Sequence, residues 1–211
     1  QTAWHEGDIQ VLKQLVAAGI AGVVVPKAET VSVLHAIAQT AGPACALIPL
    51  VETVAGMDAL ASLSAAPQVA RLAFGHLDFQ VDAGMQCADD EGELLPTRMA
   101  IVMASRRANL APPIDGVTVD TKDSTHMDAD CQRALRMGFG AKLCIHPAQI
   151  AVAHQVFSPT EAAVAHASAV VQAMELAQGG VCVVNGKMVD APVLHLAQRT
   201  LQRHVWAQQR P

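Results

Sequence analysis

The chain has 211 residues, enough for one large domain or two small ones with a well-buried core. Hydrophobic residues make up 52% of it and aromatic residues only 3%, which favours layered helices and strands built from Ala, Val, Leu and Ile over a β-sandwich. The net charge of −5 and the lack of a long basic run argue against nucleic acid, or an anionic membrane surface, as a partner.

The spacing of the cysteines and the length of the apolar runs indicate the cellular compartment of the protein. No Cys-x-x-Cys pair occurs, which fits reduced thiols in the cytoplasm better than a disulfide framework or a zinc cluster. No apolar run reaches the roughly 18 residues of a membrane span, and the polar N-terminus does not resemble a secretory signal. We therefore expect a cytoplasmic protein. The five cysteines are Cys45, Cys87, Cys131, Cys144 and Cys182.

Helical and strand-like segments alternate along the first three quarters of the chain. The first helix is predicted at 8–18, with Asp8 as its N-cap and Gly19 as its C-terminal stop. Near-continuous apolar strands that alternate with helices predict a parallel sheet, either open and doubly wound or closed into an eight-stranded barrel. Strands are predicted at 21–26, 44–52, 72–74, 115–120 and 142–147, and further helices at 29–40, 56–65, 96–109 and 127–137.

The last quarter of the chain has a different pattern. Ser158 and Glu161 have the spacing of a capping box, with Pro159 at the first helical position, so a long helix is predicted to begin there. Residues 181–190 predict a hairpin with its turn at Asn185-Gly186, followed by a terminal helix.

Acidic side chains end two successive strands, which points to a metal site. Chemistry gathers at the carboxyl ends of parallel strands in both candidate architectures. Glu52 and Asp78 end neighbouring strands, and two such carboxylates repel unless a cation lies between them. Mg²⁺ takes oxygen ligands, and Gly75 would let the backbone approach a ligand there. The competing interpretation of each acid is a helix N-cap or a solvated loop group.

Six motifs occur in one order and carry a family resemblance. They resemble the citrate lyase beta-subunit-like and malyl-CoA lyase proteins of the HpcH/HpaI aldolase family, from about residue 19 to the C-terminus. The motifs are "VVVPKAET", "LIPLVETVAGM", "LAFGHLDFQVDAG", "DGVTVDTKD", "GFGAKLCIHPAQI" and "NGKMVDAPV".

The resemblance implies an α/β (β/α)8 TIM barrel with a C-terminal helical extension. The expected division is a partial barrel at 1–157 and a lid-like extension at 158–211. The family also has three earlier strands and an arginine that binds the substrate, and this chain starts after them. Since five strands cannot close an eight-stranded barrel, we expect a truncated chain, or an inactive one if it is complete.

The resemblance also implies roles for individual residues. Glu52 and Asp78 would bind Mg²⁺ and, with Gly75 and Leu77, line the substrate end. Leu77 departs from the family, which has an acid at this position, and the change could weaken metal binding or alter substrate choice. Asp190 resembles a lid aspartate that a neighbouring subunit supplies as general acid, which implies a homo-oligomer, a trimer or hexamer.

The implied reaction is a Mg²⁺-dependent carbon–carbon cleavage. A 3-hydroxyacyl thioester of the malyl-, citramalyl- or citryl-CoA type would yield an oxo acid and acetyl-CoA, with CoA or an acyl-carrier protein bearing the ester. Three alternatives stay open: an acyl-CoA thioesterase, an aldolase acting on free 2-oxo acids, and a non-catalytic subunit of a lyase complex.

Other candidate residues have competing structural interpretations. Lys27 could form a Schiff base, but a charged rim residue is the preferred interpretation. Lys142 is predicted to start its strand, at the face opposite to the chemistry, and His146 to be structural. Asp120 and Asp123 could be N-caps or site residues. Four histidines are predicted to lie on helices as surface or core residues: His154, His166, His195 and His204.

Overall fold

The computed structural model describes residues 5–209 and divides the chain into two compact units. The first unit ends at Gln149 and the second begins at Ile150. This division falls near the start of helix α8 (Ala148–Phe157), whereas the sequence predicts it at the end of that helix, after residue 157. Each unit is described separately below.

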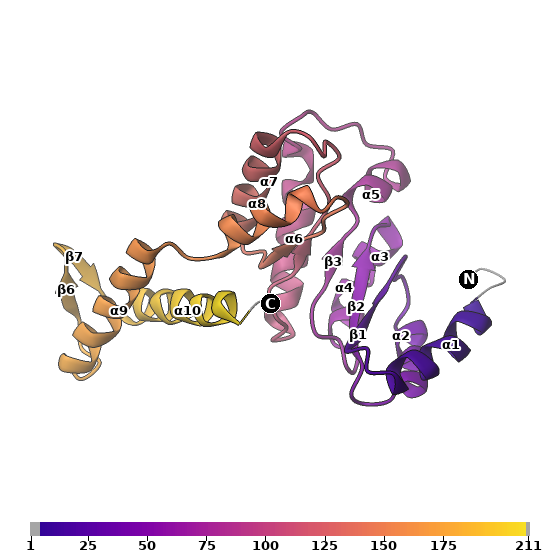
Figure 1. Cartoon of the computed structure of the whole chain (residues 1–211), viewed down its shortest axis with the longest axis horizontal. Helices are drawn as coiled ribbons and strands as arrows, with labels where there is room; N and C mark the ends of the chain where they lie inside the picture. Colours follow the sequence, from indigo (N-terminus) through magenta and orange to yellow (C-terminus); the bar gives the residue numbers. More distant parts are fainter. Residues whose placement is uncertain (1–4, 210–211) are drawn as a thin grey trace. The chain divides into compact units, whose positions relative to one another are not determined.

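The first unit is built on a parallel sheet of five strands, which makes the described fold α/β (Figure 1). The strands pair in chain order, so each one lies beside its neighbour in sequence. This arrangement needs a crossover of a dozen or more residues between strands, and helices provide most of them. The strands are β1 Gly22–Val25, β2 Ala46–Val51, β3 Ala73–Phe74, β4 Ile114–Asp115 and β5 Ala141–Lys142.

The strand register fixes which side chains share a face of this sheet. Leu50 pairs with Ala73, and Ala73 pairs with Ile114, so these three residues lie on one face. Val51 and Phe74 pair on the opposite face, where both side chains are fully buried. If the pairing register is extended by one residue beyond the strand ends, Glu52 lies opposite Gly75, on the same face as Leu50 and Ala73.

Helices connect the strands, and their ends follow local sequence signals. Asp123 caps α7 by accepting hydrogen bonds from the backbone N–H groups of Thr125 and His126, and Gly138 ends the helix with a φ of 102°. The predicted cap Asp8 is wrong, because helix α1 already begins before it. The helices of this unit are α1 His5–Ala17, α2 Val31–Ala41, α3 Val54–Asp58, α4 Leu60–Ser64, α5 His76–Asp82, α6 Leu95–Arg107 and α7 Ser124–Met137, with a 3-10 turn η1 at Gly92–Leu94.

The fourth and fifth strands are shorter than the sequence predicts and lie earlier in the chain. β4 ends at Asp115, and the following apolar residues do not continue it; among them, the Thr118 side chain donates a hydrogen bond to Asp130 at 2.6 Å. β5 consists of Ala141 and Lys142 alone. Lys142 therefore ends its strand, at the carboxyl edge of the sheet, and the prediction that it starts the strand is wrong.

The second unit packs two helices against a hairpin. Strands β6 (Cys182–Val184) and β7 (Lys187–Val189) are antiparallel, and the predicted Asn185-Gly186 turn is confirmed, with φ of 50° and 74°. Thr160 caps helix α9, so the predicted Ser158 capping box is wrong. The helices are α9 Glu161–Leu176 and α10 Ala191–Gln208, and the buried core consists of Ala167, Val170, Met174, Val184, Val189 and Ala197.

Within residues 5–209, no helix combines the length and apolar character needed to cross a membrane.

Candidate functional site

Glu52 follows β2 directly and is held in one orientation. Its side chain is buried, and the backbone N–H of Lys27 donates a hydrogen bond to Oε1 at 2.8 Å. Lys27 has a left-handed backbone with a φ of 45°, a conformation that is uncommon for a residue other than glycine. Burial raises the pKa of Glu52, the Lys27 amide lowers it, and the charge of Asp78 raises it again, leaving it above its ordinary value.

Gly75 leaves room for the carboxylate of Glu52. A Cβ at Gly75 would lie 2.6 Å from both Cβ and Oε2 of Glu52, which no real side chain tolerates. The Gly75 N–H donates to the carbonyl of Val51 at 2.9 Å, so the backbone of this turn is fixed to β2. In the sequence "FGH", only glycine at position 75 lets the Glu52 side chain lie this close to the backbone.

Asp78 lies in the first turn of α5, not in the loop that the sequence predicts. Its side chain is exposed, as is that of Leu77, and its charge reaches Glu52 strongly enough to raise the pKa of that carboxyl. A negative side chain in the first turn is favourable for the helix dipole. The structure therefore brings Glu52 and Gly75 into contact, and Asp78 is near enough for its charge to act on Glu52. Leu77 precedes Asp78 in the same turn of α5.

This pair of carboxylates suits a hard cation that keeps open positions. Among residues 5–209, neither Glu52 nor Asp78 takes part in an ion pair. The charge of Lys27 acts on Glu52, but it does not bring the pKa of that carboxyl back to its ordinary value. In the same range, no cluster of three or more His, Cys, Asp or Glu side chains is arranged to hold a metal. Mg²⁺ commonly binds through one or two carboxylates and fills the rest of its shell with water or substrate oxygens, so the residues present fit it.

A cavity of about 890 Å³ opens beside Glu52 and Lys27. Its walls are mostly apolar and come from α1, β1 and α2, including Leu12, Val25 and Ile37. The carboxylate of Glu52 thus borders a space large enough for a small organic molecule.

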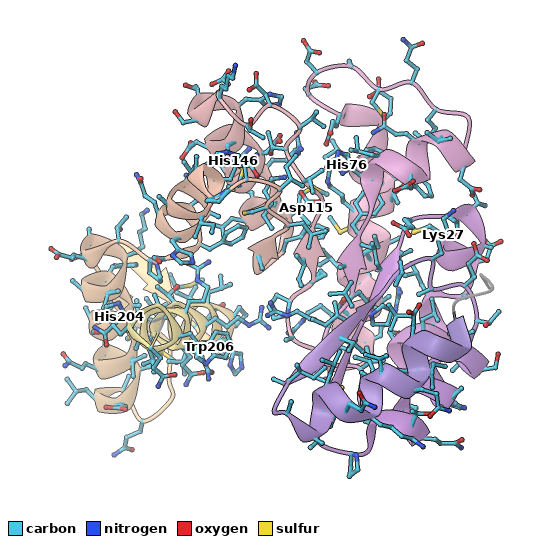
Figure 2. All side chains as sticks on the ribbon, turned by 45° about the vertical axis from the view of Figure 1, so that its right-hand side comes forward. Lys27, His76, Asp115, His146, His204 and Trp206 are labelled. Atoms are coloured by element: carbon cyan, nitrogen blue, oxygen red, sulfur yellow. The ribbon has the colours of Figure 1, made fainter. Side chains whose placement is uncertain are left out.

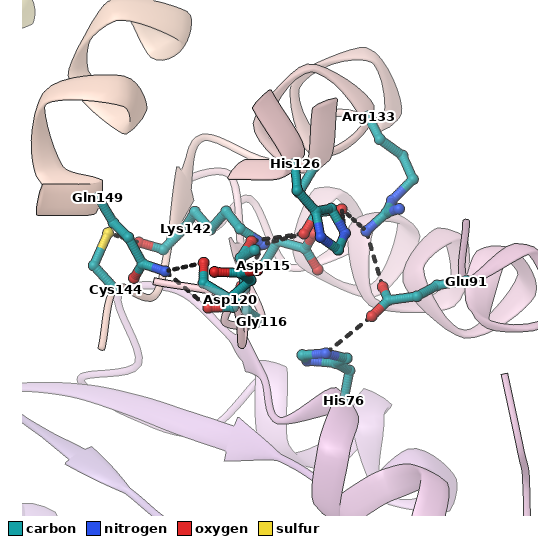
Figure 3. Close-up of polar contacts among 12 residues, drawn as sticks. His76, Glu91, Asp115, Gly116, Asp120, His126, Arg133, Lys142, Cys144 and Gln149 are labelled. Atoms are coloured by element: carbon teal, nitrogen blue, oxygen red, sulfur yellow. Dashed lines mark hydrogen bonds and ion pairs between the residues drawn. The ribbon is translucent and has the colours of Figure 1, made fainter. Parts of the chain in front are cut away.

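A network of buried charges lies beyond the ends of β3 and β4 (Figure 3). His76 is 2% exposed and its Nε2 lies 3.1 Å from Oε1 of Glu91. The other Glu91 oxygen contacts the guanidinium groups of Arg98 and of Arg133, the latter at 2.8 Å. Burial raises the pKa of Glu91, but its contacts with His76 and Arg98 outweigh burial and lower the pKa to about 2.

The network continues to β4 and β5. Arg98 is fully buried, and its Nε lies 3.0 Å from Oδ1 of Asp115. Arg133 also contacts Asp130 at 2.9 Å, and the Nζ of Lys142 donates to the carbonyl of Gly116 at 2.7 Å. Arg133 and Asp130 are three residues apart on α7, but the other pairs join segments that lie further apart in the chain, and sequence patterns did not indicate them.

The remaining predicted candidates have ordinary structural roles. Asp120 accepts hydrogen bonds from the backbone of Lys122 and Asp123, and the exposed His146 accepts one from the N–H of Ala148 at 3.1 Å. Figure 2 shows Lys27 and His76 in the first unit and His204 in the second. The predicted helical positions are confirmed for His154, His166, His195 and His204.

Asp190 lies in the second unit, where it caps α10. Its Oδ1 accepts a hydrogen bond from the N–H of Val193 at 3.2 Å. The cap accounts for an acidic residue at this position, and the role of Asp190 as a general acid stays a prediction.

Comparisons with known proteins agree on one family. The profile of the HpcH/HpaI aldolase/citrate lyase family matches residues 3–147. The chain is 34% identical over 207 residues to the citrate lyase subunit beta-like protein of Deinococcus radiodurans, covering 95% of this chain and 71% of that protein. It is 30% identical over 205 residues to a (3S)-malyl-CoA thioesterase of Cereibacter sphaeroides, covering 96% and 70%.

A solved structure with the same fold was obtained with ligands. CitE from Mycobacterium tuberculosis, in complex with magnesium, acetoacetate and coenzyme A, matches with a TM-score of 0.80 and 28% identity. The match covers 97% of this chain and 74% of that one.

Proposed function

Because the chain belongs to the HpcH/HpaI aldolase/citrate lyase family, we propose that it is a Mg²⁺-dependent lyase that cleaves a 3-hydroxyacyl-CoA thioester. The observation that carries this proposal is that the charge of Asp78 acts on the buried carboxyl of Glu52 at the carboxyl edge of the sheet, where neither acid forms an ion pair with a described residue. The magnesium-bound CitE structure supports the choice of ion.

The proposed chemistry assigns each residue a task. Glu52 and Asp78 bind the ion, which when bound acts as a Lewis acid on the oxygens of a small oxo acid. Gly75 and Leu77 line the substrate end. The 3-hydroxyl group loses its proton to solvent and becomes the carbonyl of the oxo acid as the bond between C2 and C3 of the acyl chain breaks, and the electron pair of that bond stays with C2 as the enolate of acetyl-CoA. Asp190 donates the proton that converts this enolate to acetyl-CoA.

We further propose that the five strands belong to a (β/α)8 barrel. Parallel strands that pair in chain order, each reached through a crossover, support this architecture. The position of Glu52 and Asp78 at the carboxyl edge agrees with where such barrels place their sites.

We also propose a homo-oligomer, trimeric or hexameric, in which a neighbouring subunit completes the site; an exposed apolar face of the hairpin supports an interface there. Val183 pairs with Met188 on the solvent face of the hairpin, and their exposed fractions are 68% and 66%. The same register brings Val181, also exposed, opposite Asp190. Exposed apolar side chains in a contiguous group are typical of an interface. A neighbouring subunit would thus receive Asp190 together with this apolar face.

Hydrolysis of the same thioester is the second candidate function. The similarity to a (3S)-malyl-CoA thioesterase favours it, since that enzyme is 30% identical over most of this chain. The two functions differ in which bond breaks: the lyase cleaves a carbon–carbon bond, and the thioesterase cleaves the bond between carbonyl carbon and sulfur.

Product analysis tests the proposal and separates the candidates. The purified protein would be incubated with malyl-CoA, citramalyl-CoA or citryl-CoA and Mg²⁺, and the products separated by liquid chromatography. Acetyl-CoA with an oxo acid indicates the lyase, and free CoA with the hydroxy acid indicates the thioesterase. EDTA and Asp78→Ala should abolish either activity, whereas the exposed control Asp89→Ala should not. Turnover that persists in EDTA would overturn the magnesium role.

A further inference from the structure

Helix α5 carries Asp78 and is anchored at both of its ends. Its first residue, His76, points into the buried charge network, and its last residue, Asp82, accepts a hydrogen bond from the N–H of Val54 at 2.8 Å. Val54 follows Glu52 by two residues. The helix therefore has one anchor to the segment that bears Glu52 and one to the network behind it.

The ring of His76 is held from two sides. Its Nε2 lies 3.1 Å from Glu91, whose own position is fixed by Arg98 and Arg133. The ring of Phe74 lies 6.2 Å away between centroids, at an angle of 56°. With 2% of its surface exposed, the imidazole has little freedom to move.

Gly116 makes room for this ring. A Cβ at Gly116 would overlap Nδ1 of His76 and also lie 3.0 Å from its Cγ and Cε1. The Nδ1 atom itself is buried and has no hydrogen-bond partner. An unpartnered buried nitrogen costs stability, and the contact of Nε2 with Glu91 offsets that cost, so the ring is held in one orientation by Glu91 and by the space at Gly116.

We propose that His76 is a positioning residue for the metal site, which fixes the first turn of α5 and so holds Asp78 at the distance from Glu52 that one ion requires. This inference rests on the proposed metal role of Glu52 and Asp78. His76 acts through its bond to Glu91, and Gly116 admits the ring. A residue that orients a metal ligand typically changes metal affinity by about 10- to 100-fold when it is lost.

Binding of Mn²⁺, followed by electron paramagnetic resonance of the free ion, tests the inference without any substrate. His76→Asn shortens the side chain, so its amide cannot reach Glu91, and affinity should fall by about tenfold or more. His76→Gln places an amide N–H close to the position of Nε2 and should recover most of the affinity. Gly116→Ala, which leaves every ligand and His76 in the sequence, should lose as much affinity as His76→Asn.

Gly7→Ala is the matched control, because a Cβ at Gly7 in helix α1 meets no atom of the described part of the chain within 4 Å. Its affinity should equal that of the unchanged protein. Thermal melting of each variant is recorded alongside, so that binding is compared only below the melting temperature. If His76→Asn does not fold, the inference is tested by the Mn²⁺ affinities of Gly116→Ala, which should be lowered, and of His76→Gln, which should be close to that of the unchanged protein.

The outcomes separate this inference from the proposed function. If the unchanged protein binds no Mn²⁺, the proposed metal site fails and the inference fails with it. If that protein binds Mn²⁺ and the folded His76 and Gly116 variants bind it equally well, His76 is merely structural and the inference alone is overturned. Variants of His76 or Gly116 that melt at a lower temperature but bind Mn²⁺ with unchanged affinity would likewise show that His76 is merely structural.

Discussion

Two groups of acidic side chains lie near the same edge of the sheet, and their surroundings differ. Glu91 contacts His76, Arg98 and Arg133, and the pKa of its carboxyl is lowered to about 2. Among the described residues Glu52 forms no ion pair. Burial and the charge of Asp78 raise its pKa by more than the amide and the charge of Lys27 lower it. A buried carboxylate that is paired with Arg or His side chains, such as Glu91, can have a purely structural role. A carboxylate that lies near another acid, such as Glu52, is stabilised in its charged form when a metal ion binds to it.

The largest expected effect comes from removing the cation that the buried acids share. Arg98→Met would leave Glu91 with one guanidinium fewer and Asp115 with no cation, both largely buried. We expect a loss of about 3–5 kcal/mol in the free energy of unfolding, measured by urea denaturation at pH 7. Arg106→Met, at an exposed position of the same helix, should cost less than about 1 kcal/mol. Equal losses would mean that the network does not depend on Arg98.

The depressed pKa of Glu91 predicts an acid-dependent loss of stability. Because its ionised form is favoured in the folded state, its contribution is complete above its ordinary pKa of 4.5 and is lost as the pH falls towards 2. The lowered pKa corresponds to a contribution of roughly 3 kcal/mol to the free energy of unfolding at neutral pH. Urea denaturation between pH 7 and pH 3 should show a shallower pH dependence for Glu91→Gln than for the unchanged protein. The exposed control Glu93→Gln should follow the unchanged protein, and a Glu91→Gln profile that does the same would contradict the role of Glu91.

The raised pKa of Glu52 predicts the opposite sign and a smaller effect. Its charged form is disfavoured in the folded state, so the contribution of Glu52 to stability is greatest below the ordinary pKa of 4.5 and falls as the pH rises through the raised value. In EDTA at pH 7, Glu52→Gln should therefore be more stable than the unchanged protein, and the difference should close below pH 4.5. Glutamine keeps an oxygen for the Lys27 N–H, so the hydrogen bond survives.

Added Mg²⁺ sharpens this contrast between the two groups of acids. A ligand present at 100 times its dissociation constant stabilises the folded state by about 2.7 kcal/mol, and only the protein with both carboxylates should gain it. Glu29→Gln, which changes an exposed acid in the neighbouring loop, serves as control and should respond to Mg²⁺ normally. A melting temperature that Mg²⁺ raises equally in Glu52→Gln would remove Glu52 from the metal site.

The sequence predicted those parts of the fold that depend on local patterns. The runs around Val24, Ile48 and Phe74 are apolar over several residues, and they form the first three strands. The hairpin was predictable because Asn185-Gly186 fits one type of turn. The same reasoning failed for 115–120, where alternating valines indicate a strand but the strand ends at Asp115 and the Thr118 side chain bonds to the distant Asp130 on α7.

The candidate site was predictable only in part, for a related reason. Glu52 and Asp78 follow apolar strands, so their proximity follows from a parallel sheet. The partners of the charge network are set by packing between distant segments: Arg133 lies 42 residues from Glu91. Such pairs have no periodic signal, and a histidine beside a strand gives no hint that a glycine forty residues later makes room for its ring.

The smallest expected effect concerns Asp190, whose carboxylate has two possible uses. As an N-cap, it should be worth about 1 kcal/mol, so Asp190→Ala should destabilise the protein by that amount in urea denaturation. Thr160→Ala removes the cap of α9 in the same unit and should cost a similar amount without affecting turnover. Asp190→Asn keeps a capping oxygen but cannot donate a carboxyl proton. Unchanged stability with lowered turnover would therefore support the general acid, whereas unchanged turnover would leave Asp190 with its cap alone.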